Sequence, residues 1–133
     1  MAEAIQVEQD ERQYWELGDA FVQVLVAELN DALKSMGVDD AEQRHLLCSR
    51  LAFGLGNFLD QEWMEVDGRK FYPLLCFSEK FLDFGAPLKE LEPLQMPSKE
   101  FEFHGAAVDV AHDFFKSQNE EFKGIRVGVV GEE

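Results

Sequence analysis

The first third of the chain carries a helical pattern with one apolar face. Between Tyr14 and Met36 apolar residues recur at steps of three and four, while acidic and amide residues fall mostly on the opposite side. The pattern predicts a helix over residues 10–36. Gly37 suits the left-handed conformation that ends a helix, and Asp39 with Glu42 three residues later is typical of a capped helix start. We therefore expect a tight turn into a second helix.

The second helix is predicted over residues 40–61, where Leu and Phe side chains form a wide apolar stripe. Gly54 and Gly56 interrupt this stripe, although a glycine inside a helix costs about 1 kcal/mol relative to alanine. Such a cost is tolerated where another element packs closely. We expect close packing at this turn of the helix.

From Trp63 onward the pattern of side chains changes to a period of two, which predicts a β-hairpin over residues 63–77. Asp67-Gly68 has the chemistry of a two-residue turn, because both central positions of that turn need positive φ. In this register Glu65 faces Lys70 and Trp63 faces Tyr72, which pairs opposite charges and two aromatic rings.

The remainder of the chain predicts a long loop, a helix and a strand. Residues 78–103 contain Pro87, Pro93 and Pro97 and read as a wrapping loop, which is a candidate for partner binding or a connector held by its own Leu and Phe side chains. A helix is expected over 105–118 and a strand over 125–130 that could join the hairpin. The predicted fold is a single α+β domain spanning residues 1–133, with two long helices and a C-terminal helix packed on a small antiparallel sheet. Residues 1–9 and 131–133 are expected to be disordered.

Charge narrows the kinds of partner. The chain of 133 residues has 27 acidic and 12 basic residues and a net charge of −15. Residues 1–42 hold eleven of the acidic residues against only Arg12 and Lys34. Such a chain is a poor direct ligand for nucleic acid, and a clustered acidic face would instead attract a basic protein.

Other sequence features bear on location and redox state. No apolar run is long enough to suggest a membrane span, and the N-terminus is acidic where a secretory signal would be basic. We expect a cytoplasmic protein that does not bind membranes. Cys48 and Cys76 lie in apolar segments far apart in the sequence, so both are expected to be reduced, buried thiols.

The stretch FHGAAVDVAHDFF at residues 103–115 is the nearest approach to a chemical motif. On a helix its Ala, Val and Phe side chains share one arc, and Asp109, His112, Asp113 and Lys116 share the other. Lys116 would repel a cation there, and His104 projects over the apolar side, away from the other three. The sequence therefore favours an amphipathic helix over a metal site.

Nucleophilic and cofactor chemistry receive little support. His45 and Cys48 are three residues apart, within reach of a thiolate–imidazole pair, but Cys48 lies in an apolar stretch where burial makes a thiol inert. The glycines of residues 54–57 follow no strand and lack the remaining residues of a phosphate loop. No cofactor is expected.

These observations predict a non-catalytic, acidic binding or regulatory protein that acts on a protein partner with a basic surface. An immunity-type inhibitor of a basic toxin such as a nuclease is one concrete form. The expected binding residues are five acids and two aromatic anchors: Glu16, Asp19, Asp31, Asp39, Asp40, Trp63 and Tyr72.

Two alternatives stay open. One is a small-molecule-binding protein or enzyme whose pocket lies between the helices and the hairpin, with His104, His45 or Cys48 at its edge. The other is a structural homodimer that buries surplus Phe side chains through the edge of the hairpin.

Overall fold

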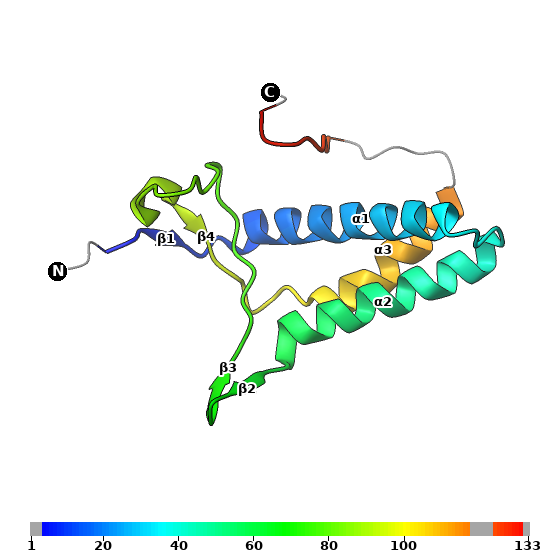
Figure 1. The fold of residues 1–133 in the computed structure, drawn as a ribbon, viewed down its shortest axis with the longest axis horizontal. Coiled ribbons are helices and arrows are strands. Elements are labelled where there is room, and N and C mark those ends of the chain that lie inside the picture. The colour runs from blue at the N-terminus through cyan, green and yellow to red at the C-terminus, as the bar shows by residue number, and fades with distance from the viewer. Residues whose placement is uncertain (1–3, 118–123, 132–133) are drawn as a thin grey trace.

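A computed structural model describes residues 4–117 and 124–131 and shows three helices with two small two-stranded sheets. The helices are α1 (Glu11–Ser35), α2 (Ala41–Gln61) and α3 (Phe103–Ser117). They lie side by side, with α3 against both of the others (Figure 1). The α+β class and the three predicted helices are confirmed.

The turn between α1 and α2 is held by polar side chains. Asp40 caps α2, because its carboxylate accepts a hydrogen bond from the backbone of Glu42 at 2.9 Å. The expected cap at Asp39 was therefore one residue too early. Arg44 then reaches back across the turn and donates to the Asn30 amide at 2.8 Å and to the Val38 carbonyl at 2.9 Å. These bonds fix the angle at which α2 returns along α1.

The core lies where the three helices meet. Its buried apolar side chains come from all three helices and from the segment before α3: Tyr14, Val22, Val26, Cys48, Ala52, Phe101, Phe103, Ala107, Val110 and Ala111. Cys48 is buried as predicted, whereas Cys76 is exposed. The apolar neighbours of Cys76 suggested burial, but they belong to a segment that runs over the surface.

The hairpin consists of β2 (Met64–Val66) and β3 (Arg69–Phe71) and has the predicted register, with Glu65 opposite Lys70. It is shorter than the predicted 63–77, because the chain leaves the hairpin after Phe71 and Phe77 pairs with Gln95. Asp67 and Gly68 occupy the turn with φ of 51° and 76°. All six strand residues are exposed, and the hairpin projects from the helices (Figure 1). The helices bury their apolar faces against one another and not on this sheet, because strands of three residues offer too little surface to pack on.

The second sheet was not predicted. β1 (Val7–Glu8), in a stretch expected to be disordered, pairs in parallel with β4 (Leu94–Gln95). The 78–103 loop thus wraps back to the N-terminal segment after a short 3-10 helix, η1 (Leu88–Leu91). Pairing between segments so far apart in the chain leaves no local sequence signal.

The expected terminal strand is absent. Residues 125–130 fall within the described part of the chain and are assigned to neither a helix nor a strand. In Figure 1 this segment lies beyond α1, on the opposite side from the hairpin it was predicted to join. Residues 132 and 133, expected to be disordered, lie outside the described residues, while Gly131 lies in a turn.

Candidate functional site

The start of α3 is fastened to the end of α2 by one carboxylate. Asp60 accepts hydrogen bonds from the backbone N–H groups of Phe103 at 2.9 Å and of His104 at 2.7 Å. The first N–H groups of a helix have no partner within the helix, so Asp60 acts as a cap supplied by a neighbouring helix. This carboxylate also contacts His104 Nδ1.

The His104 ring is held between two carboxylates. Its Nδ1 meets Asp60, and its Nε2 lies 3.3 Å from Glu102 Oε2. The edge of the ring also meets Phe53, with 5.6 Å between centroids. Since both nitrogens already face carboxylates, the geometry makes His104 a link between α2 and α3 and leaves neither nitrogen facing a substrate.

Gly56 allows the same two helices to approach closely. A Cβ atom at Gly56 would lie 2.6 Å from His104 N and 2.7 Å from the carbonyl carbon of Phe103, both backbone atoms. The close packing predicted for this turn is therefore present at Gly56. At Gly54 a Cβ atom would have no neighbour within 4 Å, so that glycine has no such role.

A small cavity lies between the helices and the segment that follows the hairpin, but its lining includes none of the predicted edge residues His104, His45 and Cys48. This cavity of about 380 Å³ is lined by residues from α1, the end of α2 and the segment before α3, including Tyr14, Asp60 and Ser98. The Tyr14 hydroxyl donates to the Leu75 carbonyl, and burial, aided by the charges of Cys76 and Asp60, raises the pKa of Tyr14 to about 12. A phenol held protonated in this way is suited to structural hydrogen bonding.

The residues predicted at the edge of that pocket lie elsewhere. Cys48 is fully buried, with its Sγ atom 3.9 Å from the Val26 carbonyl oxygen, and burial raises the pKa of its thiol. His45 stacks on Phe115 with 5.0 Å between centroids and 12° between ring planes. Each side chain thus has a packing role, as predicted for Cys48.

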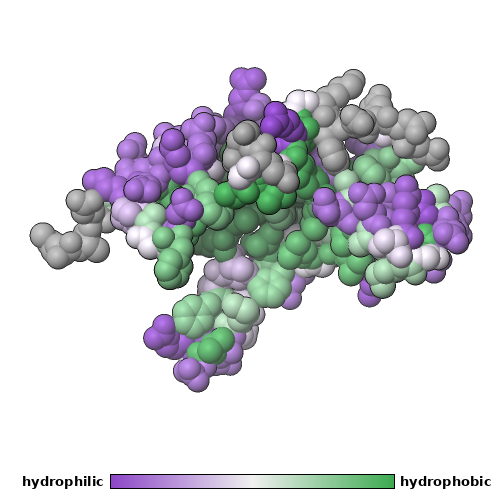
Figure 2. All heavy atoms as spheres, turned by 45° about the horizontal axis from the view of Figure 1, so that its top comes forward, coloured by the Kyte–Doolittle hydropathy of each residue, from purple (hydrophilic) through white to green (hydrophobic). Residues whose placement is uncertain are grey.

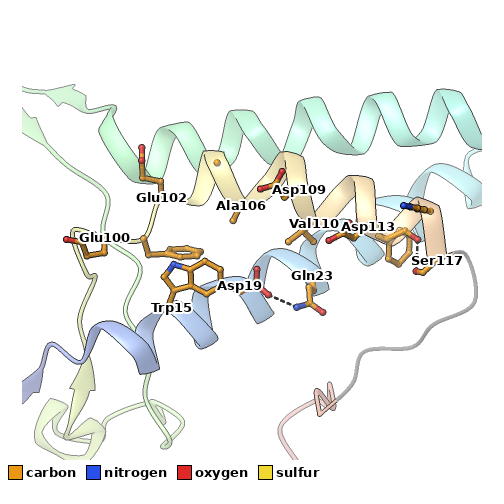
Figure 3. A pocket seen from close by; sticks show the side chains of 14 residues that line it. Trp15, Asp19, Gln23, Glu100, Glu102, Ala106, Asp109, Val110, Asp113 and Ser117 are labelled. Atoms are coloured by element: carbon orange, nitrogen blue, oxygen red, sulfur yellow. Dashed lines mark hydrogen bonds between the residues drawn. The ribbon is translucent and has the colours of Figure 1, made fainter.

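A larger groove runs along the other side of α3, between α3 and α1 (Figure 3). Its volume is about 1030 Å³. Apolar residues from both helices and from the segment before α3 line it: Trp15, Phe101, Ala106, Val110 and Phe114. Five carboxylates also line the groove: Asp19, Glu100, Glu102, Asp109 and Asp113. Lys116 is the single basic residue among the lining residues. The groove therefore combines apolar surface with negative charge.

Trp15 is the most exposed aromatic side chain of the groove, with half of its surface accessible. Its ring meets the edge of Phe101, with 5.6 Å between centroids and 79° between ring planes. Gly18 lies beneath Phe101, since a Cβ atom there would come within 2.5 Å of the ring. Phe101 thus fills the space beside α1, and Trp15 stays at the surface where a partner can contact it.

The acidic residues chosen from the sequence do not form one surface. Asp19 lies in the groove and accepts a hydrogen bond from Gln23 at 2.7 Å, shown as the dashed line in Figure 3. Glu16 is exposed and pairs with Arg12 at 3.6 Å. Asp31 lies in the second half of α1, while Asp39 and Asp40 lie in the turn before α2.

The two proposed aromatic anchors lie on the hairpin. Trp63 is 46% exposed and has the Lys70 ammonium 4.4 Å from its ring centroid. Tyr72 is 62% exposed. Both are accessible to a partner, but the hairpin is a separate projection and contributes no residue to the groove.

Sequence reasoning missed the groove residues on α3. Asp109, Asp113 and Lys116 were placed on one polar face and line the groove together with Val110, but nothing in the local pattern joins that face to Trp15 and Asp19 of α1. Residues so far apart are brought together only by the packing of the helices. Among residues 4–117 and 124–131, no three His, Cys, Asp or Glu side chains converge closely enough to hold a metal ion.

Comparison with known proteins returned no match among family models, curated proteins or solved structures. Within the part of the chain that the structure describes, none of the helices has the length and apolar character needed to cross a membrane.

Proposed function

We propose that this chain is a non-catalytic binding protein that takes up a basic, amphipathic helical segment of a protein partner in the groove between α1 and α3. The observation that carries the proposal is the composition of the groove, which sets five carboxylates beside an apolar floor and a half-exposed tryptophan. Tryptophan is among the residues most enriched at the centres of protein interfaces.

The dimensions of the groove favour a helix of about three turns. The lining residues on α3 run from Gly105 to Ser117, and a helix rises about 1.5 Å per residue, so this wall is roughly 18 Å long. A helix in a groove places apolar anchors at every third and fourth position and exposes its remaining residues to the rim. Lysines or arginines at those remaining positions would meet the carboxylates.

Charge is expected to govern how fast the partner arrives. Carboxylates that line a groove concentrate their field there, and such fields accelerate the association of a partner of opposite charge. Screening over about 8 Å at physiological salt weakens this effect. A basic toxin held inactive by its inhibitor is one partner class with this chemistry.

The test uses a synthetic 14-residue peptide of leucine and lysine with helical spacing, together with an acidic peptide of the same apolar pattern. A Trp63→Phe background leaves Trp15 as the one tryptophan, because the chain has two, so its fluorescence reports on the groove. We expect the basic peptide to bind at least tenfold more tightly than the acidic one. We also expect its association to slow markedly between low and physiological salt.

The decisive comparison is between two double variants that remove the same charge. The groove variant, Asp109→Asn with Asp113→Asn, changes two carboxylates that line the groove. The control variant, Asp31→Asn with Asp39→Asn, changes two carboxylates outside it. The groove variant should weaken binding about tenfold, which corresponds to about 1.4 kcal/mol, and the control variant less than twofold. Equal losses in the two variants, or an association rate that ignores salt, would show that the groove is not the binding site.

A further inference from the structure

Two separate parts of the surface expose apolar residues in strand-like sequence. One is the hairpin, and the other is the segment of residues 125–130. Neither lines the groove, so an inference drawn from them is independent of the function proposed above.

The hairpin is a sheet left with both edges open in the described part of the chain. β2 pairs only with β3. Six large apolar residues in and beside its strands are between 41% and 64% exposed: Trp63, Met64, Val66, Phe71, Tyr72 and Leu74. Figure 2 shows the hairpin projecting from the body with apolar residues on its surface. An isolated two-stranded hairpin is at best marginally stable in water, and an open edge invites a further strand.

Residues 125–130 have the composition of such a strand. Ile125, Val127 and Val129 alternate with Arg126 and Gly128, and β-branched residues are favoured in strands. Val127, Val129 and Val130 are all more than half exposed. The segment lies beyond α1, away from the hairpin of its own chain (Figure 1).

Charge also favours contact at these two places. A chain of net charge −15 repels a second copy over most of its surface. The hairpin, however, balances Glu65 and Asp67 with Arg69 and Lys70, and residues 125–130 carry only the positive charge of Arg126. Two copies can therefore meet here without bringing their acidic surfaces together.

The chain as a whole exposes more surface than a compact monomer of its mass. The chain exposes 10112 Å², whereas a compact monomer of its mass exposes roughly 7,000 Å². The excess of about 3,000 Å² per copy exceeds the roughly 1,200–2,000 Å² of total surface that a stable interface buries.

We propose that residues 125–130 of one copy add as a third strand to the hairpin of a second copy, and that the exchange is reciprocal. The outer edge of β2, where the backbone N–H and carbonyl groups of Glu65 face away from β3, receives the strand. A twofold axis relates the two identical contacts, as in other closed exchanges of an element between subunits. The open hairpin and the exposed valines are thereby covered together.

Sedimentation of the full chain at 10–100 μM tests the exchange. We expect the wild type to have twice the 15.2 kDa mass of one chain. Val127→Asp with Val129→Asp should raise the dimer dissociation constant at least tenfold. The matched control, Met36→Asp with Leu46→Asp, changes two residues that are 78% and 70% exposed outside the proposed contact and should remain dimeric.

Hydrogen exchange of the β2 amides supplies the second readout. The N–H groups of Met64 and Val66 face β3, whereas that of Glu65 faces the open edge, so we expect the Glu65 amide to be protected in the wild-type dimer and to lose that protection in the Val127/Val129 variant. A monomeric wild type at 100 μM overturns the proposal, as does a dimer that the valine variant leaves intact. A monomer with a protected Glu65 amide would overturn it as well, since the segment would then pair within its own chain.

Discussion

The two sides of α3 pack in opposite ways. Against α2 the helix backbones touch, because Gly56 leaves room for the backbone of His104 and small residues such as Ala52 and Ala107 continue the contact. Against α1 the contact is less extensive, and the bulky side chains of Phe101 and Phe114 line a groove of about 1030 Å³ between the two helices. The same helix thus forms a closed contact on one side and an open one on the other, because the sizes of the residues between the helices differ.

Carboxylates on the two sides of α3 differ in the same way. Asp60 is committed to two backbone N–H groups and a histidine ring. Asp109 and Asp113 are exposed in the wall of the groove. A carboxylate with partners inside the chain stabilises the fold, and one that faces solvent is available to a partner.

The largest expected effect is at the closed contact. Gly56→Ala would place a Cβ atom 2.6 Å from the backbone nitrogen of His104, so α2 and α3 must separate. We expect the free energy of unfolding to fall by about 3 kcal/mol, measured by urea denaturation.

Gly54→Ala is the matched control, because a Cβ atom there meets nothing within 4 Å. Alanine at that site should raise the free energy of unfolding by up to about 1 kcal/mol. If both substitutions stabilise the chain, the closed contact is looser than the structure has it.

A smaller effect is expected where Asp60 holds the start of α3. Asp60→Ala removes the acceptor of two helix N–H groups and a partner of His104, and should lower the free energy of unfolding by about 2 kcal/mol. Asp31→Ala, at an exposed site on α1, should change it by less than about 0.5 kcal/mol. Equal responses of the two variants in denaturant titrations would argue against the cap.

The smallest effect tests the open contact. Gly105 lines the groove, and a Cβ atom there would have only Glu102 Cβ nearby, at 3.9 Å. Gly105→Ala should therefore raise the free energy of unfolding by up to about 1 kcal/mol, as an exposed glycine-to-alanine change in a helix does. A loss of 1 kcal/mol or more in thermal unfolding would mean that α1 and α3 close on each other in solution.

The local sequence was sufficient for the helices and the hairpin. Apolar periodicity gave the three helices to within about two residues at each end, and Asp67-Gly68 with its flanking pairs gave the register of β2 and β3. These features depend on residues a few positions apart, so they leave a local signal. The strand predicted at 125–130 had the same kind of signal but no pairing partner within reach in the structure.

For the candidate site, the sequence gave the residue types but not the place. The excess of acidic residues and the polar face of α3 were both visible in it, and Asp19 was among the expected binding residues. The sequence did not show that Asp19 lies in one groove with Trp15, Asp109 and Asp113. The sequence placed His104 over the apolar face of its helix. It did not indicate that the partner of His104 is Asp60, forty-four residues earlier in the chain.

The sequence by itself thus determined the helices, the hairpin turn, the burial of Cys48 and the acidic character of the chain, because each follows from periodicity, turn chemistry or composition. The tertiary structure alone decided which contact of α3 is closed and which is open, and which carboxylates stay exposed. Those outcomes depend on the sizes of residues from different helices that meet only after the chain has packed.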